Sequence, residues 1–154
     1  MRTLSVYRCV LLCLCASAIV ECGPRRVKRS IGEFGDMIRA KAQREALLYN
    51  NYGNHCGVQG GNEPVVDEVD RCCYNHDRCY IEASGSNGAC SSSWFGPSFT
   101  RYTWSWDGAS LHCGEDNDDC ETASCLCDVT AANCFSRHPW NSEHKHFSIW
   151  DVLA

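Results

Sequence analysis

Apolar residues recur at intervals of three and four positions from Ile31 through Phe34 and Ile38 to Ala42. This period is that of an amphipathic helix, so the pattern predicts a helix over residues 30–46. Ser30 is placed to cap its start, because a serine side chain can accept a hydrogen bond from the first helical turn. The stripe either packs inward only or also contacts a ligand, and the pattern leaves both interpretations open.

Cysteines recur every seven residues in two later stretches, which contain Cys72 and Cys79, and then Cys120, Cys127 and Cys134. Seven residues are two helical turns, so each set lies on one face of a predicted helix. The first of these helices opens after Pro64 with Asp67 and ends in the Ser-Gly-Ser-Asn-Gly sequence at 84–88. The second is predicted over 116–135, where the acidic start suits the positive end of a helix dipole.

Between these two helices the pattern changes to that of a β-hairpin. Residues 101–106 and 109–113 flank the dipeptide Asp107-Gly108. Such a dipeptide predicts a two-residue turn between antiparallel strands. The tail from Ser136 contains aromatic residues and histidines without a period, and irregular structure is expected there.

The first 29 residues have the composition of targeting and processing segments. An apolar run over 9–20 follows two arginines, is too short to span a bilayer, and contains small residues suited to cleavage. We predict a signal peptide over 1–18 and a propeptide over 19–29 that ends in the dibasic sequence Arg25-Arg26-Val27-Lys28-Arg29. A basic linker is the alternative. The mature, secreted, extracellular domain would then be residues 30–154.

Cysteine number and charge narrow the class of the mature domain. Of the 14 cysteines four lie before residue 30, and the remaining ten predict five disulfides in a secreted chain. Residues 30–154 carry 8 Lys and Arg against 18 Asp and Glu, a net charge of −10 with neutral histidines. Nucleic acid is therefore not an expected partner, and no later apolar run is long enough for a transmembrane segment.

The densest group of reactive residues is Asp70-Arg71-Cys72-Cys73-Tyr74-Asn75-His76-Asp77-Arg78-Cys79-Tyr80. Adjacent helical residues point about 100° apart, so His76 and Asp77 leave the same turn in different directions. An imidazole beside a carboxylate that faces another way indicates a general base next to a cation site. A histidine that is only part of the core is the alternative.

The second cysteine helix can bring another carboxylate to His76. If Cys72 were bonded to Cys134 and Cys79 to Cys127, the two helices would run antiparallel. Asp128 would then lie about 3 Å of axial rise from His76. A parallel pairing would separate the two side chains, and cysteine spacing alone does not fix the connectivity.

Taken together, these motifs resemble those of the secreted phospholipases A2. The central sequence resembles their active-site helix, and Tyr52-Gly53-x-x-Cys56-Gly57 with Gly60-Gly61 and Pro64 resembles their calcium loop. Cys125-Leu126-Cys127-Asp128 with Ala131-Ala132 and Cys134-Phe135 resembles their second active-site helix. The resemblance covers residues 30–152 and is greatest to the pancreatic and elapid-venom type.

The resemblance implies a mainly α, disulfide-rich fold. Two long antiparallel disulfide-linked helices would be accompanied by an N-terminal helix, a calcium loop and a small β-hairpin. The implied activity is calcium-dependent hydrolysis of the sn-2 acyl ester of glycerophospholipids, which releases a fatty acid and a lysophospholipid. A phospholipase A2-like toxin or receptor ligand without catalysis is the alternative, although such proteins typically lose the histidine or the calcium-binding aspartate.

Four residues would carry the chemistry if the resemblance holds. His76 would deprotonate the water that attacks the ester carbonyl. Asp128 would hold the tautomer and orientation of His76. Tyr80 and Tyr102 would hydrogen-bond Asp128 and keep it ionised.

Ca²⁺ is the cofactor that the resemblance implies. Asp77 would bind it through both oxygens, together with the main-chain carbonyls of His55, Gly57 and Gln59. The Gly57 N–H would help to stabilise the oxyanion. His55 and Gln59 depart from the family's usual residues, and a non-glycine residue at positive φ costs about 1 kcal/mol or more. Weak calcium affinity is therefore expected, or a third carbonyl from Gly60 instead of Gln59.

A phospholipid aggregate or membrane surface is the implied partner, bound peripherally. Ile31, Phe34 and Ile38 would line the entrance for acyl chains. The net charge favours a zwitterionic over an anionic surface. Trp104 and Trp106 of the predicted hairpin either insert into lipid or simply pack.

The resemblance also implies a disulfide pattern. The implied pairs are Cys56–Cys73, Cys72–Cys134, Cys79–Cys127, Cys90–Cys120 and Cys113–Cys125. Two bridges usual in the pancreatic type are missing: Ala40 and Trp106 stand at the ends of one, and Asn54 stands at one end of the other. Each missing bridge could cost roughly 2–4 kcal/mol of stability.

Overall fold

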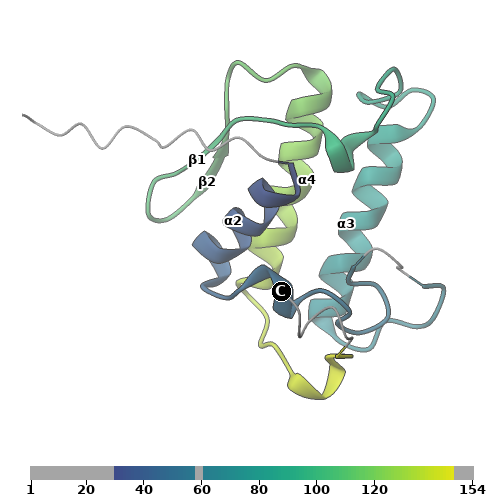
Figure 1. The fold of residues 1–154 in the computed structure, drawn as a ribbon, viewed down its shortest axis with the longest axis vertical. Coiled ribbons are helices and arrows are strands. Elements are labelled where there is room, and N and C mark those ends of the chain that lie inside the picture. The colour runs from purple at the N-terminus through teal and green to yellow at the C-terminus, as the bar shows by residue number, and fades with distance from the viewer. Residues whose placement is uncertain (1–29, 58–60, 148–154) are drawn as a thin grey trace, which may run out of the picture.

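The computed structural model describes residues 30–57 and 61–147, without the side chains of Ser30 and Ile31. The predicted signal peptide and propeptide lie outside the described residues. The helices and strands shown in Figure 1 are α2 (Ser30–Ala42), α3 (Glu68–Ser84), β1 (Trp104–Trp106), β2 (Leu111–Cys113) and α4 (Asp119–Phe135). Short 3-10 turns occur at Ala46–Leu48, Pro97–Phe99 and Ser142–His144.

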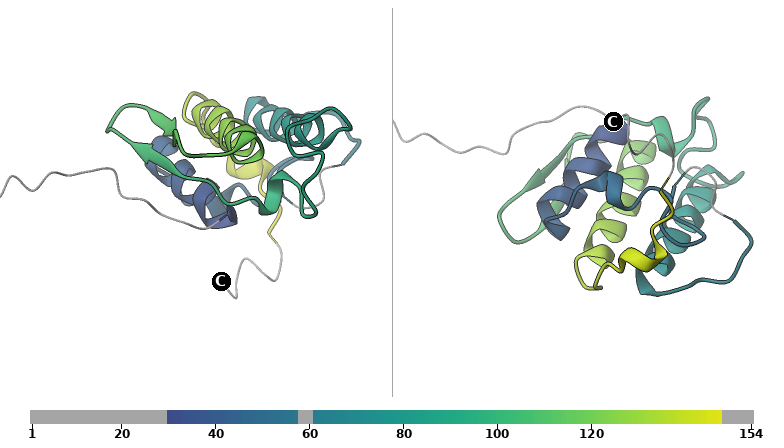
Figure 2. Two further views of the ribbon diagram at one scale, coloured as in Figure 1. Left: turned by 90° about the horizontal axis from the view of Figure 1, so that it is seen from above. Right: turned by 60° about the horizontal axis from the view of Figure 1, so that its bottom comes forward.

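Helix α4 lies between α2 and α3, and the views in Figures 1 and 2 agree on this order. Disulfides Cys72–Cys134 and Cys79–Cys127 join α3 to α4 at two levels. Because the earlier cysteine of one helix is bonded to the later cysteine of the other, the two helices run antiparallel. The mainly α, disulfide-rich fold predicted from the sequence is confirmed.

Three further disulfides attach the connections to this helix pair. Cys56–Cys73 ties the loop before α3 to that helix, Cys90–Cys120 ties the segment after α3 to the start of α4, and Cys113–Cys125 ties β2 to α4. All five bonds are the pairs that the resemblance implies. The loops that border the two long helices are therefore covalently held in place.

The core fills the space between α2, α4 and the loops. Its fully buried members include Met37, Tyr52, Val69 and Ala132. Trp104 is also buried, and its Nε1 is a buried side-chain donor without a hydrogen-bond partner among the described residues. The hairpin therefore faces the core through Trp104 and Leu111.

Helices α2 and α4 are both shorter than the sequence predicts. Helix α2 ends at Ala42 instead of residue 46, because Gln43 adopts a left-handed φ of 52°, a conformation that terminates helices. Helix α4 begins at Asp119 instead of residue 116. Asp118 and Glu121 form a capping box there, in which each side chain accepts a hydrogen bond from the other residue's main-chain N–H.

The hairpin turn also differs from the prediction. Trp106 pairs with Leu111, so four residues, not two, connect the strands. Asp107 explains the longer loop, because its Oδ1 accepts hydrogen bonds from the main-chain N–H groups of Ala109 and Ser110 at 2.8 and 2.7 Å. This Asx-type turn replaces the expected Asp-Gly turn.

Among the residues that the structure describes, none of the helices has both the length and the apolar composition needed to span a bilayer.

Candidate active site

A histidine and an aspartate from the two long helices meet beside α2. His76 Nε2 lies 2.6 Å from Asp128 Oδ1. Asp128 is 1% exposed, whereas the His76 side chain is 12% exposed. The carboxylate is thus sealed in the protein, while part of the imidazole reaches the surface.

Two tyrosines complete the surroundings of Asp128. The Tyr80 hydroxyl donates to Asp128 Oδ1 at 2.7 Å, and the Tyr102 hydroxyl donates to Oδ2. Burial raises the pKa of both hydroxyls, and the negative charge of Asp128 raises these pKa values further. Both tyrosines therefore stay protonated and act as donors. An ionised Asp128 with three donors around it satisfies the requirement for burying a charge.

Aromatic rings hold the imidazole from two directions. Phe34 stacks on His76 with 4.5 Å between ring centroids and 18° between planes. The Tyr80 ring lies 4.3 Å from His76 in a tilted arrangement. Glu33, the neighbour of Phe34, is fully buried and accepts a hydrogen bond from Tyr102 N at 3.4 Å. Helix α2 is thus anchored to the tyrosine that contacts Asp128.

His76 and Asp77 both line a cavity of about 760 Å³. Phe34 and Ile38 contribute its apolar wall from α2, and Tyr49 and Phe135 add stacked rings 4.2 Å apart. His55 and Gly57 border the cavity from the loop before α3. An apolar cavity with a base and a carboxylate at its wall can receive a largely apolar molecule that carries one reactive polar group.

Asp77 lines the same cavity as His55 and Gly57, and these residues offer oxygens of the kind that a hard divalent cation takes. Burial raises the pKa of the Asp77 carboxyl, although nearby His76 and His55 lower it. No described residue donates a hydrogen bond to this carboxylate, and no described N–H bonds to the carbonyl oxygens of His55 or Gly57. Calcium prefers carboxylate and main-chain oxygens, so the residues present fit this ion.

A family model described as phospholipase A2 matches residues 31–145. The chain belongs to the phospholipase A2 family. It is 39% identical to a phospholipase A2 of Bos taurus over 139 residues, which are 88% of this chain and 94% of the relative. It is 40% identical to a phospholipase A2 of Ovis aries over 119 residues, 76% of this chain and 95% of the relative.

A toxin component is a third relative. The acidic phospholipase A2 homolog taipoxin gamma chain of Oxyuranus scutellatus scutellatus is 36% identical over 134 residues, 86% of this chain and 87% of the relative. Membership in the phospholipase A2 family supports phospholipid hydrolysis and action at lipid interfaces. The family is generally calcium-dependent.

The structure places most of the phospholipase site residues predicted from sequence at one location. His76, Asp128, Tyr80 and Tyr102 form a single hydrogen-bonded group, and Asp77 borders the same cavity. The side chain of Ile31 and all of Gln59 lie outside the described residues. The predicted roles of these two residues therefore stay predictions.

The His55 backbone does not have the positive φ that the sequence leaves open. Of the described residues, only Gln43 and Asn51 combine a side chain with positive φ. The His55 ring is used locally, since its Nε2 lies 3.0 Å from Glu63 O. Gly57 does have a φ of 111°, which a glycine adopts readily.

The exposed aromatic residues of this phospholipase family member lie elsewhere than the hairpin. Trp104 is 8% exposed, so of the two alternatives left open for it the structure shows packing, while Trp94, Phe95 and Phe99 are 92%, 71% and 61% exposed. Phe99 also lines the cavity. Sequence reasoning missed this group because loop residues without a period give no amphipathic signal.

Proposed function

We propose that this chain is a secreted, calcium-dependent phospholipase A2 that hydrolyses the sn-2 acyl ester of glycerophospholipids. The observation that carries the proposal is the hydrogen bond between His76 and the buried Asp128, next to Asp77 on the wall of an apolar cavity. This arrangement supplies a base, its orienting acid and a cation ligand at one place. No nucleophilic side chain is required, because water can serve as the nucleophile.

His76 acts as the general base. With the Nε2 proton held by Asp128, the lone pair on Nδ1 is available to take a proton from water. The water oxygen then attacks the ester carbonyl carbon, and the same Nδ1 proton is returned to the leaving glycerol oxygen as the C–O bond breaks. The stacked Phe34 ring keeps the imidazole in one orientation during both transfers.

Asp128 and the tyrosines act on the base and not on the substrate. A positive imidazole forms when Nδ1 takes the proton, and the ionised Asp128 stabilises it across the 2.6 Å contact. Tyr80 and Tyr102 hold the Asp128 carboxylate in place by donating hydrogen bonds to both of its oxygens. The Gly57 N–H supplies a donor for the negative charge that develops on the ester oxygen.

Asp77, with the carbonyls of His55, Gly57 and Gln59, would hold Ca²⁺. When bound, the ion supplies positive charge that polarises the ester carbonyl. Asp77 gains from this arrangement because burial alone disfavours its ionised form.

The apolar rim supports peripheral action at a phospholipid surface. The ring centroids of Phe95 and the cavity-lining Phe99 lie 6.5 Å apart, and the neighbouring Trp94 is 92% exposed. Phe34 and Ile38, which line the cavity, would form the entrance for acyl chains together with Ile31. With a net charge of −10 after residue 29, we expect faster hydrolysis of zwitterionic than of anionic vesicles. Processing of 1–18 as a signal peptide and of 19–29 as a propeptide would deliver an extracellular enzyme that begins at Ser30.

Fatty-acid release from phosphatidylcholine vesicles tests the proposal. Activity should require calcium and disappear with a chelator. His76→Gln should lower kcat about a thousandfold, the size of a general-base contribution, and leave calcium affinity almost unchanged. Asp77→Asn should abolish both activity and calcium binding. His112→Gln, at an exposed histidine of β2 that does not line the cavity, serves as the matched control and should change neither.

The alternative is a toxin-like or receptor-binding protein without catalysis. The relative named as a phospholipase A2 homolog gives this reading its support. If correctly folded wild-type protein releases no detectable fatty acid, with or without calcium, the alternative is established and the proposed enzymatic function is refuted.

A further inference from the structure

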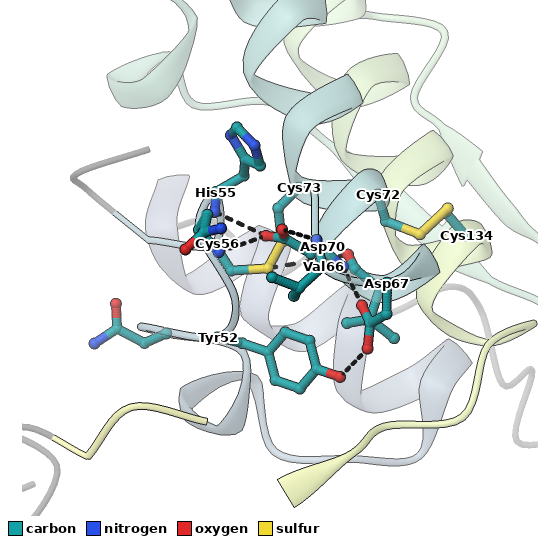
Figure 3. Close-up of a disulfide and its surroundings, with 12 residues drawn as sticks. Tyr52, His55, Cys56, Val66, Asp67, Asp70, Cys72, Cys73 and Cys134 are labelled. Atoms are coloured by element: carbon teal, nitrogen blue, oxygen red, sulfur yellow. Dashed lines mark hydrogen bonds between the residues drawn. A yellow bond between two sulfur atoms is a disulfide. The ribbon is translucent and has the colours of Figure 1, made fainter. Parts of the chain in front are cut away.

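Asp70 is a fully buried carboxylate that the proposed mechanism does not use. It lies in the first turn of α3, and its exposed fraction is 0%. In Figure 3 its oxygens face both the chain near His55 and the chain near Val66. Since a buried charge is costly unless hydrogen bonds satisfy it, the donors around Asp70 indicate its purpose.

Three main-chain N–H groups donate to this carboxylate. Asn54 N and His55 N donate to Asp70 Oδ1 at 3.0 and 2.7 Å, and Val66 N donates to Oδ2 at 3.0 Å. Gly53 permits this close approach, because a Cβ there would lie 2.4 Å from Asp70 Cγ. The chain that enters the calcium loop is thus held directly against the carboxylate.

The bond to His55 N also orients a carbonyl. In a trans peptide the N–H and C=O point in opposite directions, so the carbonyl of Asn54 turns away from Asp70. That carbonyl accepts a hydrogen bond from Gly61 N at 2.8 Å. Asp70 therefore orients the peptide between Asn54 and His55, and the carbonyl of that peptide accepts the hydrogen bond from Gly61 N that closes the loop.

A main-chain hydrogen bond orients the next peptide, between His55 and Cys56. Cys56 N donates to Tyr52 O at 3.2 Å, so the His55 carbonyl points away from Tyr52. Its oxygen, which accepts no hydrogen bond from a described main-chain N–H, is one of those assigned to calcium above.

We propose that Asp70 is a positioning residue for the calcium loop, whose carboxylate fixes the peptides at 54 and 55 so that the loop carbonyls are preorganised for the cation. The inference rests on the calcium-binding role proposed for this loop. An acid that only stabilised the fold would affect unfolding alone. Asp70 should instead set the affinity for calcium as well.

Asp70→Ala and Asp70→Asn test this with calcium titration by calorimetry. The alanine variant removes all three acceptor contacts, whereas asparagine keeps one oxygen for the loop amides and turns its amide toward Val66. Because each lost hydrogen bond to a charged group weakens an interaction about 10–100-fold, calcium Kd should rise about a hundredfold in Asp70→Ala and about tenfold in Asp70→Asn. Saturating calcium should restore most of kcat in the asparagine variant.

Asp118→Ala is the matched control. Asp118 is the N-cap of α4 and accepts a main-chain N–H, from Glu121 at 2.8 Å, but α4 starts at the opposite end of the antiparallel helix pair from the loop before α3 (Figure 1). This variant should lose thermal stability and keep the wild-type calcium Kd. An unchanged Kd in Asp70→Ala, or an equal rise in Asp118→Ala, would overturn the proposal.

Hydrogen exchange without calcium separates this inference from the proposed function. The amide protons of residues 54 and 55 should exchange slowly in the wild type and rapidly in Asp70→Ala. Equal exchange in the two proteins would refute the positioning role. A wild type that binds no calcium would refute the calcium role of the loop, while protection lost only in Asp70→Ala would still support Asp70 as the residue that holds it.

Discussion

The two halves of the site are held by different forces. The catalytic half is the proposed base and acid, His76 and Asp128, on helices that two disulfides join. The calcium half is the loop proposed to bind calcium, which one disulfide, Cys56–Cys73, and a set of hydrogen bonds hold against the start of α3. Covalent links between regular helices fix the catalytic pair, whereas the loop carbonyls depend on individual polar contacts.

This contrast separates two kinds of failure. Damage to the helix clamp, the two disulfides that join α3 to α4, should misplace the base and lower kcat. Damage to the loop contacts should weaken calcium binding and leave kcat intact once calcium is saturating. The described part of the tail supports the second half, because His144 O accepts from Gly53 N at 2.8 Å and Asn51 O accepts from His146 N at 2.9 Å.

The largest effect is expected from opening the helix clamp. Replacing Cys79 and Cys127 with alanine should cost about 2–4 kcal/mol of unfolding free energy. It should also lower kcat about tenfold, since a small misplacement of reacting groups is costly. Urea unfolding and vesicle hydrolysis measure the two quantities.

Replacing Cys90 and Cys120 with alanine provides the comparison. That bridge lies at the start of α4, eight residues before Asp128. A similar loss of stability with normal kcat is expected. Equal losses of kcat in both double variants would show that the clamp has no special relation to the base.

A smaller effect is expected from the buried tyrosines at high pH. The pKa of Tyr102 is raised in the folded protein by burial and by Asp128, so the folded state keeps a proton that the unfolded chain loses above about pH 10. The resulting stability is fully present below that pH and declines above it, by about 1.4 kcal/mol per pH unit for each such group. Tyr102→Phe should make this decline less steep by about 1.4 kcal/mol per pH unit, as measured by unfolding experiments between pH 9.5 and 11.

The smallest effect is expected from loosening the loop at one hydroxyl. The Tyr52 hydroxyl donates to Asp67 at the start of α3 and accepts from Asn141 N at 3.1 Å. Tyr52→Phe should raise calcium Kd about fivefold, the size of one ordinary hydrogen bond, with kcat unchanged at saturating calcium. A fall in kcat without a change in calcium Kd would erase the distinction between the two halves.

The catalytic half could be predicted from sequence because it depends on repeating patterns. Cysteines spaced by seven residues located both helices, and an antiparallel pairing placed Asp128 beside His76, as the structure shows. The connectivity itself came from a resemblance, since spacing permits other pairings. Helix ends were less accurate, because Gln43 and the capping box at Asp118 act through single-residue geometry.

The calcium half shows what such patterns miss. Asp70 stood inside the recognised motif, yet nothing in its spacing revealed three main-chain donors from residues 54, 55 and 66. The helical period of residues 30–46 likewise does not single out Glu33, which is fully buried. Both acids are used by backbone groups far along the chain, which only the folded structure brings near.

Because two tyrosines donate hydrogen bonds to Asp128, the fold should tolerate the loss of His76 better than the loss of Asp128. A descendant could exchange the imidazole for another side chain and remain folded, since the acid would keep two hydroxyl donors. Losing the acid instead would leave the Tyr80 hydroxyl without its acceptor and the Tyr102 hydroxyl with the weakly accepting Met37 sulfur at 4.0 Å, at a cost in stability that selection would notice. Proteins with this fold that have lost catalysis should therefore still carry the aspartate.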